Sequence, residues 1–202
     1  MNKQNDNIKT YNVKLYGEQQ FTQHWLNLLS HITEAYNCCS LLIKENNIPL
    51  SLVPIHNQCY DILRDTFPML PSQFIIRIQK EVLRAYKSKK SNKHKGEMPQ
   101  KHNLSVTLDK RLYSNFTTEG ISMISDTPNK RKRFTFKLYP KIQEMLNTYV
   151  ATDPVIFARN NELYLSIPFR IQGRMPQNDE CIGIDMGIKR LFVTSEGLAF
   201  KD

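Results

Sequence analysis

The spacing of apolar residues changes twice along the chain, and these changes constrain the fold more than any other feature of the sequence. Residues 10–16 (TYNVKLY) alternate apolar and polar positions, which predicts a short β-strand. Residues 21–85 instead place apolar side chains three and four positions apart, as amphipathic helices do. From Leu104 to Phe169 the period returns to two. We therefore expect an α+β fold in which a helical block is inserted into an antiparallel β domain, with residues 10–16 pairing across the insertion.

Proline and asparagine divide the helical block into three helices. The first carries Trp25 on its apolar stripe, so we place this side chain in the core, and residues 46–49 (NNIP) end the helix. Pro54 can open the second helix and Pro71 the third, because the first turn of a helix leaves its N–H groups unbonded and proline has none to lose. Three amphipathic helices can bury their apolar faces against one another as a small bundle.

The β region contains one clear hairpin. Residues 155–158 and 163–169 read as its two strands. Asn160 and Asn161 lie at the turn between them, where asparagine tolerates positive φ. A short helix is expected over residues 142–149, just before the hairpin.

Composition and cysteine content limit the class of protein. The 202 residues are 40% apolar and 23% charged, which is typical of a globular chain. No apolar run approaches the roughly 18 residues of a transmembrane helix, and the N-terminus lacks the apolar segment of a secretory signal. The four cysteines form no C-x-x-C pair, and the five histidines have no metal-ligand spacing with them. We expect a reduced, cytoplasmic protein without a zinc site.

Positive charge is concentrated in the middle of the chain. Residues 84–141 contain 15 Lys and Arg residues against four acidic ones, whereas the rest of the chain contains 13 basic and 15 acidic residues. Such clustering favours binding to nucleic acid, since each phosphate that a cation neutralises releases counterions. A solubilising or localisation-like basic loop is the alternative, and a membrane surface is less favoured because neither cluster lies on a clear amphipathic helix. The expected nucleic-acid-binding residues are Lys87, Lys89, Lys90, Lys93, Lys95, Lys130, Arg131, Lys132, Arg133 and Lys137.

Aromatic residues beside these cations are candidates for stacking on bases, as in proteins that bind single strands. Tyr113, Phe116 and Tyr139 lie in the basic segment. Phe134 lies there too, but its place in an alternating run favours the core of a strand.

Residues 181–201 (CIGIDMGIKRLFVTSEGLAFK) read as short strands separated by turns. Asp185 lies within the first apolar run, between Gly183 and Gly187. A carboxylate in a buried strand must be paired or bind a metal ion, because a bare buried charge is costly. The flanking glycines leave room for a ligand or a backbone to approach. An aspartate at a strand end or in a turn is the alternative interpretation.

The segment GIDMGIKRLFVTSEG resembles the first RuvC motif of the TnpB family, the transposon-encoded RNA-guided nucleases related to type V CRISPR effectors. Three other segments are similar to the same family. TYNVKLYGEQQ is similar to its opening strand, and LPSQFIIRIQKEVLRAYKSKK to the LPSQ-led helix of its recognition lobe. LYLSIPF is similar to part of the strand pair before RuvC. Together these segments extend the resemblance over nearly the whole chain.

The resemblance implies an α+β architecture of three parts. Residues 1–17 and 99–178 would form the wedge domain, an oligonucleotide-binding-like antiparallel β-barrel, and residues 18–98 an inserted three-helix recognition lobe. Residues 179–202 would form the first strands of the RNase H-like RuvC nuclease fold. Guide RNA and target DNA would then lie against the basic clusters, with base pairing reading sequence and the protein reading backbone shape.

For the nuclease site, the resemblance implies a catalytic, magnesium-binding role for Asp185. RuvC chemistry needs two metal ions held by several carboxylates. The family's later glutamate, later aspartate and cysteine zinc finger have no counterpart before Asp202. We therefore expect the 202-residue chain to hold no metal ion stably and not to cut DNA on its own.

As a function, the resemblance implies an N-terminal fragment of a TnpB-like transposon-associated DNA endonuclease, which binds guide RNA and target DNA. Two alternatives stay open. One is a non-cleaving regulator that binds nucleic acid. The other is one half of a split nuclease, completed by a further polypeptide that supplies the rest of RuvC.

Overall fold

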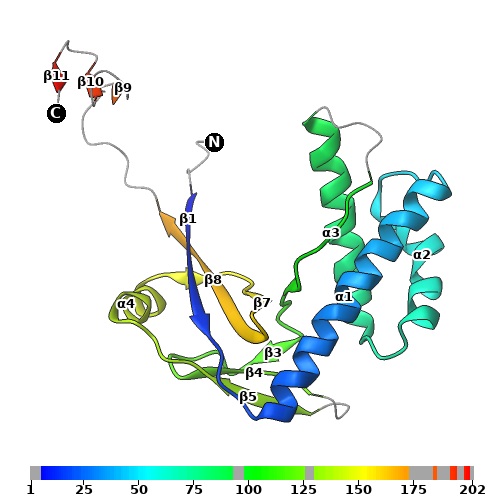
Figure 1. Cartoon of the computed structure of the whole chain (residues 1–202), viewed down its shortest axis with the longest axis horizontal. Helices are drawn as coiled ribbons and strands as arrows, with labels where there is room; N and C mark the ends of the chain where they lie inside the picture. Colours follow the sequence, from blue (N-terminus) through cyan, green and yellow to red (C-terminus); the bar gives the residue numbers. More distant parts are fainter. Residues whose placement is uncertain are drawn as a thin grey trace. The chain divides into compact units, whose positions relative to one another are not determined.

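The computed structural model describes residues 6–92, 98–125, 130–172, 184–185, 192–194 and 198–200. The chain divides into two compact units (Figure 1). The larger unit spans Asp6–Ile171, and its described residues form four helices and two sheets. The described residues of the smaller unit form three short strands. The fold is mixed α+β with antiparallel sheets, as the hydrophobic periods predict.

The three expected helices are present and pack against one another. They are α1 (Gln19–Glu45), α2 (Leu52–Thr66) and α3 (Ser72–Ser91). Figure 1 shows them side by side, and Trp25 of α1 is completely buried, as expected. Pro54 lies at the third position of α2, not the first, because the N–H groups of the whole first turn are unbonded and proline is tolerated there. Pro71 lies one residue before the first residue of α3, not at its first position. In the described part of the chain, no helix is both long enough and apolar enough to cross a membrane.

The first sheet has the strand order β1–β8–β7–β2, and β6 pairs with the far end of β8. Its strands are β1 (Asp6–Lys14), β2 (Ser105–Thr107), β6 (Val150–Ala151), β7 (Val155–Arg159) and β8 (Glu162–Gln172). The predicted hairpin is confirmed: β7 pairs with β8, and Asn160 and Asn161 at the turn have φ values of 52° and 58°. Helix α4 (Pro140–Thr148) precedes this region, with Pro140 in its first turn.

The second sheet has the order β3–β4–β5. Its strands are β3 (Tyr113–Ser114), β4 (Gly120–Ile124) and β5 (Arg131–Thr135). Phe134 of β5 is fully buried and stacks on Phe21 of α1, with ring centroids 4.5 Å apart, so its expected place in a strand core is confirmed. The indole Nε1 of Trp25 donates to the carbonyl of Ile124 at 3.2 Å. The second sheet therefore packs directly against the start of the helical block.

The chain passes from the first sheet to the second within two residues. The N–H of Leu15 donates to the carbonyl of Leu163 in β8 at 2.9 Å, and the next residue, Tyr16, exchanges two hydrogen bonds of 2.8 Å with Thr135 of β5. Gly17 follows, where a Cβ atom would lie 2.5 Å from the Phe134 ring, so only glycine fits. Residues 10–16 thus pair with strands that follow the helical block, as predicted. Neither sheet of the larger unit closes into a barrel in the described residues.

The C-terminal strands are β9 (Ile184–Asp185), β10 (Phe192–Thr194) and β11 (Ala199–Phe200). They form an antiparallel sheet in the order β11–β10–β9, in which Val193 lies opposite Asp185. This agrees with the strands expected in residues 181–201. Residues 182, 183 and 186–188 of the expected first strand lie outside the described residues.

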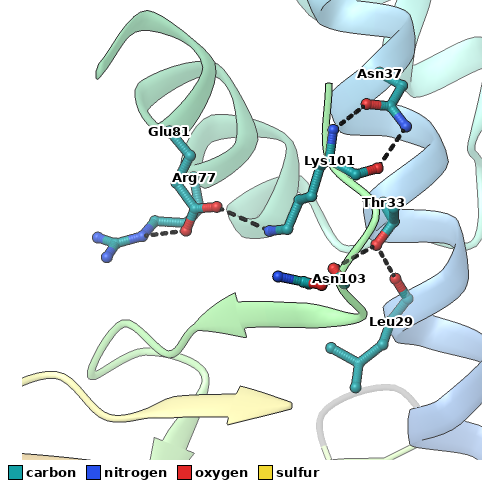
Figure 2. Close-up of polar contacts among 7 residues, drawn as sticks. All are labelled: Leu29, Thr33, Asn37, Arg77, Glu81, Lys101 and Asn103. Atoms are coloured by element: carbon teal, nitrogen blue, oxygen red, sulfur yellow. Dashed lines mark hydrogen bonds and ion pairs between the residues drawn. The ribbon is translucent and has the colours of Figure 1, made fainter. Parts of the chain in front are cut away.

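A row of polar side chains on α1 fastens the segment 98–104, which leads from the helical block to β2 (Figure 2). Ser40 donates to the carbonyl of Pro99 at 2.7 Å, and Thr33 to the carbonyl of Asn103 at 3.3 Å. Between them, the Asn37 amide bonds both backbone groups of Lys101, at 2.8 and 2.9 Å. Alternate residues of an extended chain lie about 6.6 Å apart, and four helical residues rise about 6.0 Å. Because these spacings are similar, side chains of one helix face can satisfy alternate residues of the segment.

Replacing Asn37 by alanine should lower the free energy of unfolding by about 1–2 kcal/mol, because the N–H and carbonyl of Lys101 lose their partner in a half-buried place. Urea unfolding measures the change. Asn27→Ala is the matched control, since Asn27 lies on the exposed face of the same helix, where its amide oxygen accepts a hydrogen bond from Gln23. Equal losses in the two variants would contradict a fastening role for Asn37.

Candidate nucleic-acid interface

A cleft of about 900 Å³ lies where the helical block meets the second sheet. We call it the first basic cleft. Four cationic side chains line it, and the described lining residues include no Asp or Glu. The cations come from three separate parts of the chain: Arg64 from α2, Arg111 from the turn after β2, and Lys130 with Arg131 from the start of β5. The helices and the sheet therefore bring positive charge together from residues far apart in sequence.

The floor of the first basic cleft is apolar and its rim is polar. Leu28, Leu70 and Leu112 are all less than 5% exposed and belong to the apolar part of the lining. His24 and Ser72 are among the neutral polar residues beside them. An apolar floor under a cationic rim is suited to a ligand that has both a flat organic part and an anionic part.

Backbone carbonyls hold two of the rim arginines. The guanidinium of Arg64 donates to the carbonyl of Leu70, in the turn between α2 and α3. The guanidinium of Arg131 donates to the carbonyl of Arg111 at 2.8 Å and so ties β5 to the turn after β2. Neither contact uses a carboxylate, so the positive charge of both arginines is retained.

Asp109 organises the turn that carries Arg111. Its Oδ1 accepts from the Arg111 backbone N–H at 3.0 Å and from Arg111 Nε at 3.1 Å, and its Oδ2 accepts from Gln73 of α3 at 3.3 Å. The hydrogen bonds from Arg111 hold the pKa of the Asp109 carboxyl below its usual range. The carboxylate therefore stays ionised and fixes Arg111 at the rim.

A second cleft of about 680 Å³ lies between α3, β2 and the strands β6 and β8. We call it the second basic cleft. Its lining includes four cations and one acidic residue: Arg77, Arg84, Lys110, Arg170 and Asp153.

Arg77 and Arg84 belong to a basic stripe along one face of α3. Lys80 and Lys87 complete the stripe. Lys80, Arg84 and Lys87 follow Arg77 by three, seven and ten positions. These four side chains share a face because the helix has 3.6 residues per turn. The sequence prediction included only Lys87 of the four. The spacing within RIQKEVLRAYK could have found the others.

The first expected lysine cluster is divided by the structure. Lys87 is exposed on the α3 stripe, whereas Lys89 is partly buried and its Nζ lies 3.5 Å from the carbonyl of Met98, which it can reach as a donor. Lys90 is exposed at the end of α3 and lines neither basic cleft. Lys93 and Lys95 lie outside the described residues.

Lys101, which the charge count places in the first cluster, is engaged within the protein. Its Nζ lies 3.2 Å from Glu81 Oε2, and Arg77 Nε lies 3.4 Å from the other oxygen of the same carboxylate (Figure 2). The ammonium also lies 5.4 Å from the ring centroid of Tyr36. Burial raises the pKa of Tyr36 to about 12, so its phenol is neutral at physiological pH. Lys101 thus stabilises the packing of α1 and α3.

The cations of the second expected cluster also differ: some line the first basic cleft, and others pair with carboxylates or are exposed elsewhere. Lys130 and Arg131 line the first basic cleft. Lys132 pairs with Glu18 at 3.3 Å, and Arg133 lies 3.6 Å from Glu119. Lys137 is exposed and lines neither basic cleft. Successive residues of a strand face opposite sides, so the three consecutive cations of β5, Arg131, Lys132 and Arg133, cannot all act on one surface.

The aromatic candidates differ in the same way. Tyr139 is 71% exposed and could contact a ligand. Tyr113 and Phe116 pack edge to face, with ring centroids 6.2 Å apart, and Phe116 does the same with Phe136. Burial raises the pKa of the Tyr113 phenol. The rings of Tyr113 and Phe116 are thus already packed within the protein, which leaves them less available than Tyr139 for stacking on a base.

Asp185 is on β9, but its side chain lies outside what the structure describes. Within the described residues, no three His, Cys, Asp or Glu side chains gather closely enough to hold a metal ion. Cys38, Cys39 and Cys59 are free thiols, and the hydrogen bond from Cys39 to Cys59 raises the pKa of Cys39.

The role of Asp109 is testable by pH. Because its pKa is lowered on folding, Asp109 should stabilise the protein above about pH 4, where the unfolded carboxyl ionises, and lose this effect as pH falls through the folded pKa. Asp109→Asn should therefore unfold more easily than wild type by about 1 kcal/mol at pH 7, with a smaller difference at pH 3, in urea titrations. Asp61→Asn, at an exposed site on α2, is the control. A difference that is the same at both pH values would contradict the role given to the Asp109 carboxylate.

No protein-family model matches the sequence, and a search of curated proteins finds no match. The function is therefore inferred from the residues of the chain itself.

Proposed function

We propose that the larger unit binds nucleic acid through the first basic cleft, and that the chain is related to the N-terminal part of the TnpB RNA-guided nucleases. The observation that carries the binding proposal is the set of four rim cations without a described carboxylate in the lining. Arg64 and Arg131 each present a planar guanidinium group that suits a phosphate, whereas Arg111 is paired with Asp109. The ligand class is therefore a phosphodiester chain, RNA or DNA.

The distribution of ion pairs supports this site over the rest of the basic segment. No ion pair joins Lys130 or Arg131 to a carboxylate of the described residues, whereas Lys101, Lys132 and Arg133 each have one. A cation that already has a carboxylate partner gains less from a phosphate, because the existing pair must be broken. Lys130 and Arg131 can thus contact a phosphate without breaking an ion pair to a described carboxylate.

The strand arrangement supports the wedge-domain part of the proposal. Strand pairing runs through β2, β7, β8 and β1, and the bridge between Tyr16 and Thr135 leads on to β5, β4 and β3. A sheet that bends from one layer into the next in this way is compatible with an oligonucleotide-binding-like barrel. The helical block enters between Tyr16 and β2, which is the place of the recognition lobe in the family.

The C-terminal strands support the remaining part. The motif GIDMGIKRLFVTSEG covers β9 and β10, with Asp185 on the first of these strands. Two paired strands in this order are compatible with the first RuvC motif. Asp185 is accordingly the residue to which we assign the first carboxylate of a RuvC-like site.

Binding is tested by the salt dependence of affinity for a labelled 20-nucleotide RNA, measured by fluorescence anisotropy between 50 and 200 mM NaCl. For Lys130→Gln/Arg131→Gln, the slope of log K against log salt should fall by about 1.4, which corresponds to two phosphate contacts on a single strand. Affinity at 50 mM salt should fall about tenfold or more.

The matched control is Lys132→Gln/Arg133→Gln, which removes the same net charge from the same strand. We expect a much smaller change in slope, because both cations are paired with carboxylates. Equal changes in the two variants would mean that only total charge matters. No change in the first variant would remove the cleft from the binding surface.

The nuclease relation is tested with a DNA cleavage assay in magnesium or manganese. We expect no cleavage by the 202-residue chain, because a two-metal site needs several carboxylates and Asp185 is the residue here that matches one. Asp185→Ala should leave RNA binding unchanged, since no described residue beyond Arg170 lines either basic cleft. Cleavage by this chain that is lost in Asp185→Ala would contradict the expectation of an incomplete site.

A further inference from the structure

The two basic clefts share a wall. Lys110 and Arg111 are consecutive residues, yet Lys110 lines the second cleft and Arg111 the first. On α3, Gln73 lines the first cleft and Arg77 the second. These two helical positions are about 6 Å apart along the axis, at 1.5 Å per residue. The clefts are therefore neighbours on the larger unit.

The wall between the two clefts contains one side-chain hydrogen bond. Gln73 Nε2 donates to Asp109 Oδ2 at 3.3 Å and joins the first turn of α3 to the turn that carries Lys110 and Arg111. The charge of Asp109, the acidic residue in this wall, is offset by Arg111 at 3.1 Å. Between the described residues Gln73 and Asp109, the path over the wall therefore passes a carboxylate whose charge is already paired.

Cations continue on the far side of the wall. Lys110 stands next to it, and Arg77 and Arg84 follow along α3. Glu81 holds Arg77 at 3.4 Å, and the arginine side chain is only 14% exposed, so its position is fixed before a ligand binds (Figure 2). Glu81 also binds Lys101, whose backbone is bonded to Asn37 of α1. The second cleft is thus built on the same fastened segment that fixes the helical block.

The volumes limit what either cleft can hold. Cavities of 300–1,000 Å³ are the usual size for one drug-sized ligand, roughly a nucleotide or two. The clefts measure about 900 and 680 Å³, so neither can hold a long strand alone. A strand that leaves the first cleft over the Gln73–Asp109 contact meets its next cations in the second.

We propose that the two basic clefts form one continuous track for a single polynucleotide strand, which crosses the wall between Gln73 and Asp109. This inference rests on the proposed nucleic-acid binding and specifies its path. The phosphates would lie near Lys130 and Arg131 on one side, and near Lys110 and Arg84 on the other.

The experiment compares labelled oligouridylates of 4 and 12 nucleotides on wild type and three double variants. Lys130→Gln/Arg131→Gln alters the first cleft, and Arg84→Gln/Lys110→Gln the second. Lys44→Gln/Arg159→Gln removes the same charge from exposed sites that line neither basic cleft. Anisotropy gives affinity and salt slope, and titration at high protein concentration gives stoichiometry. Thermal unfolding checks that each variant is folded.

One 12-mer should bind per chain, and wild type should bind it at least tenfold more tightly than the 4-mer, because the second contact is intramolecular. This gain with length should disappear in both cleft variants, and each should lower the 12-mer salt slope by about 1.4. The control should keep both the gain and the slope.

Three results would overturn the single track. They are an unchanged gain and slope in Arg84→Gln/Lys110→Gln, two 12-mers bound per chain, or the same loss in the control as in the cleft variants. A wild-type protein that binds neither oligonucleotide would instead refute the proposed function itself. The two failures are therefore distinguishable.

Discussion

The Asn37 amide, with Ser40 and Thr33 on the same helix face, satisfies the backbone of an extended segment that would otherwise leave polar groups unpaired at a half-buried place. Both ends of the inserted helical block are thereby tied to the strands. One end is held by the pairing of Tyr16 with Thr135, and the other by the segment 98–104. This attachment fixes α3 beside the turn after β2. Both basic clefts depend on that placement, because each takes residues from α3 and from this turn.

Among the cations, the division is between those that hold the fold and those left for a ligand. Lys101, Lys132 and Arg133 have carboxylate partners, and the sequence distance between Lys132 and Glu18 is 114 residues. Such pairs cannot be seen by counting charges in a window. Arg64 shows the opposite case, since it lies outside the basic segment and still reaches the first cleft. Fold, more than local charge density, decides which cations face a ligand.

The helices could be predicted because their apolar residues repeat at helical spacing and proline and asparagine mark their ends. The β7–β8 hairpin could be predicted because Asn160 and Asn161 suit a tight turn. Strands β3 and β4 lacked such signals. The sequence of β4, GISMI, begins with glycine and has no clear alternation, and its place comes from pairing with β5. Gly120 is required there by packing, as an added Cβ would lie 2.2 Å from the Phe134 carbonyl. For the site, the sequence located Lys130 and Arg131 but not Arg64 or Arg111, which line the same cleft.

The chain contains a single tryptophan, and its position makes it an optical reporter of the contact between the helical block and the second sheet. Trp25 is fully buried on α1, and its indole donates to the carbonyl of Ile124, a residue that also lines the first basic cleft. An indole that keeps this bond in an apolar setting emits at shorter wavelength than one exposed to water. Any separation of the helical block from the second sheet would therefore shift the emission of the whole protein to the red, without a label or an added chromophore.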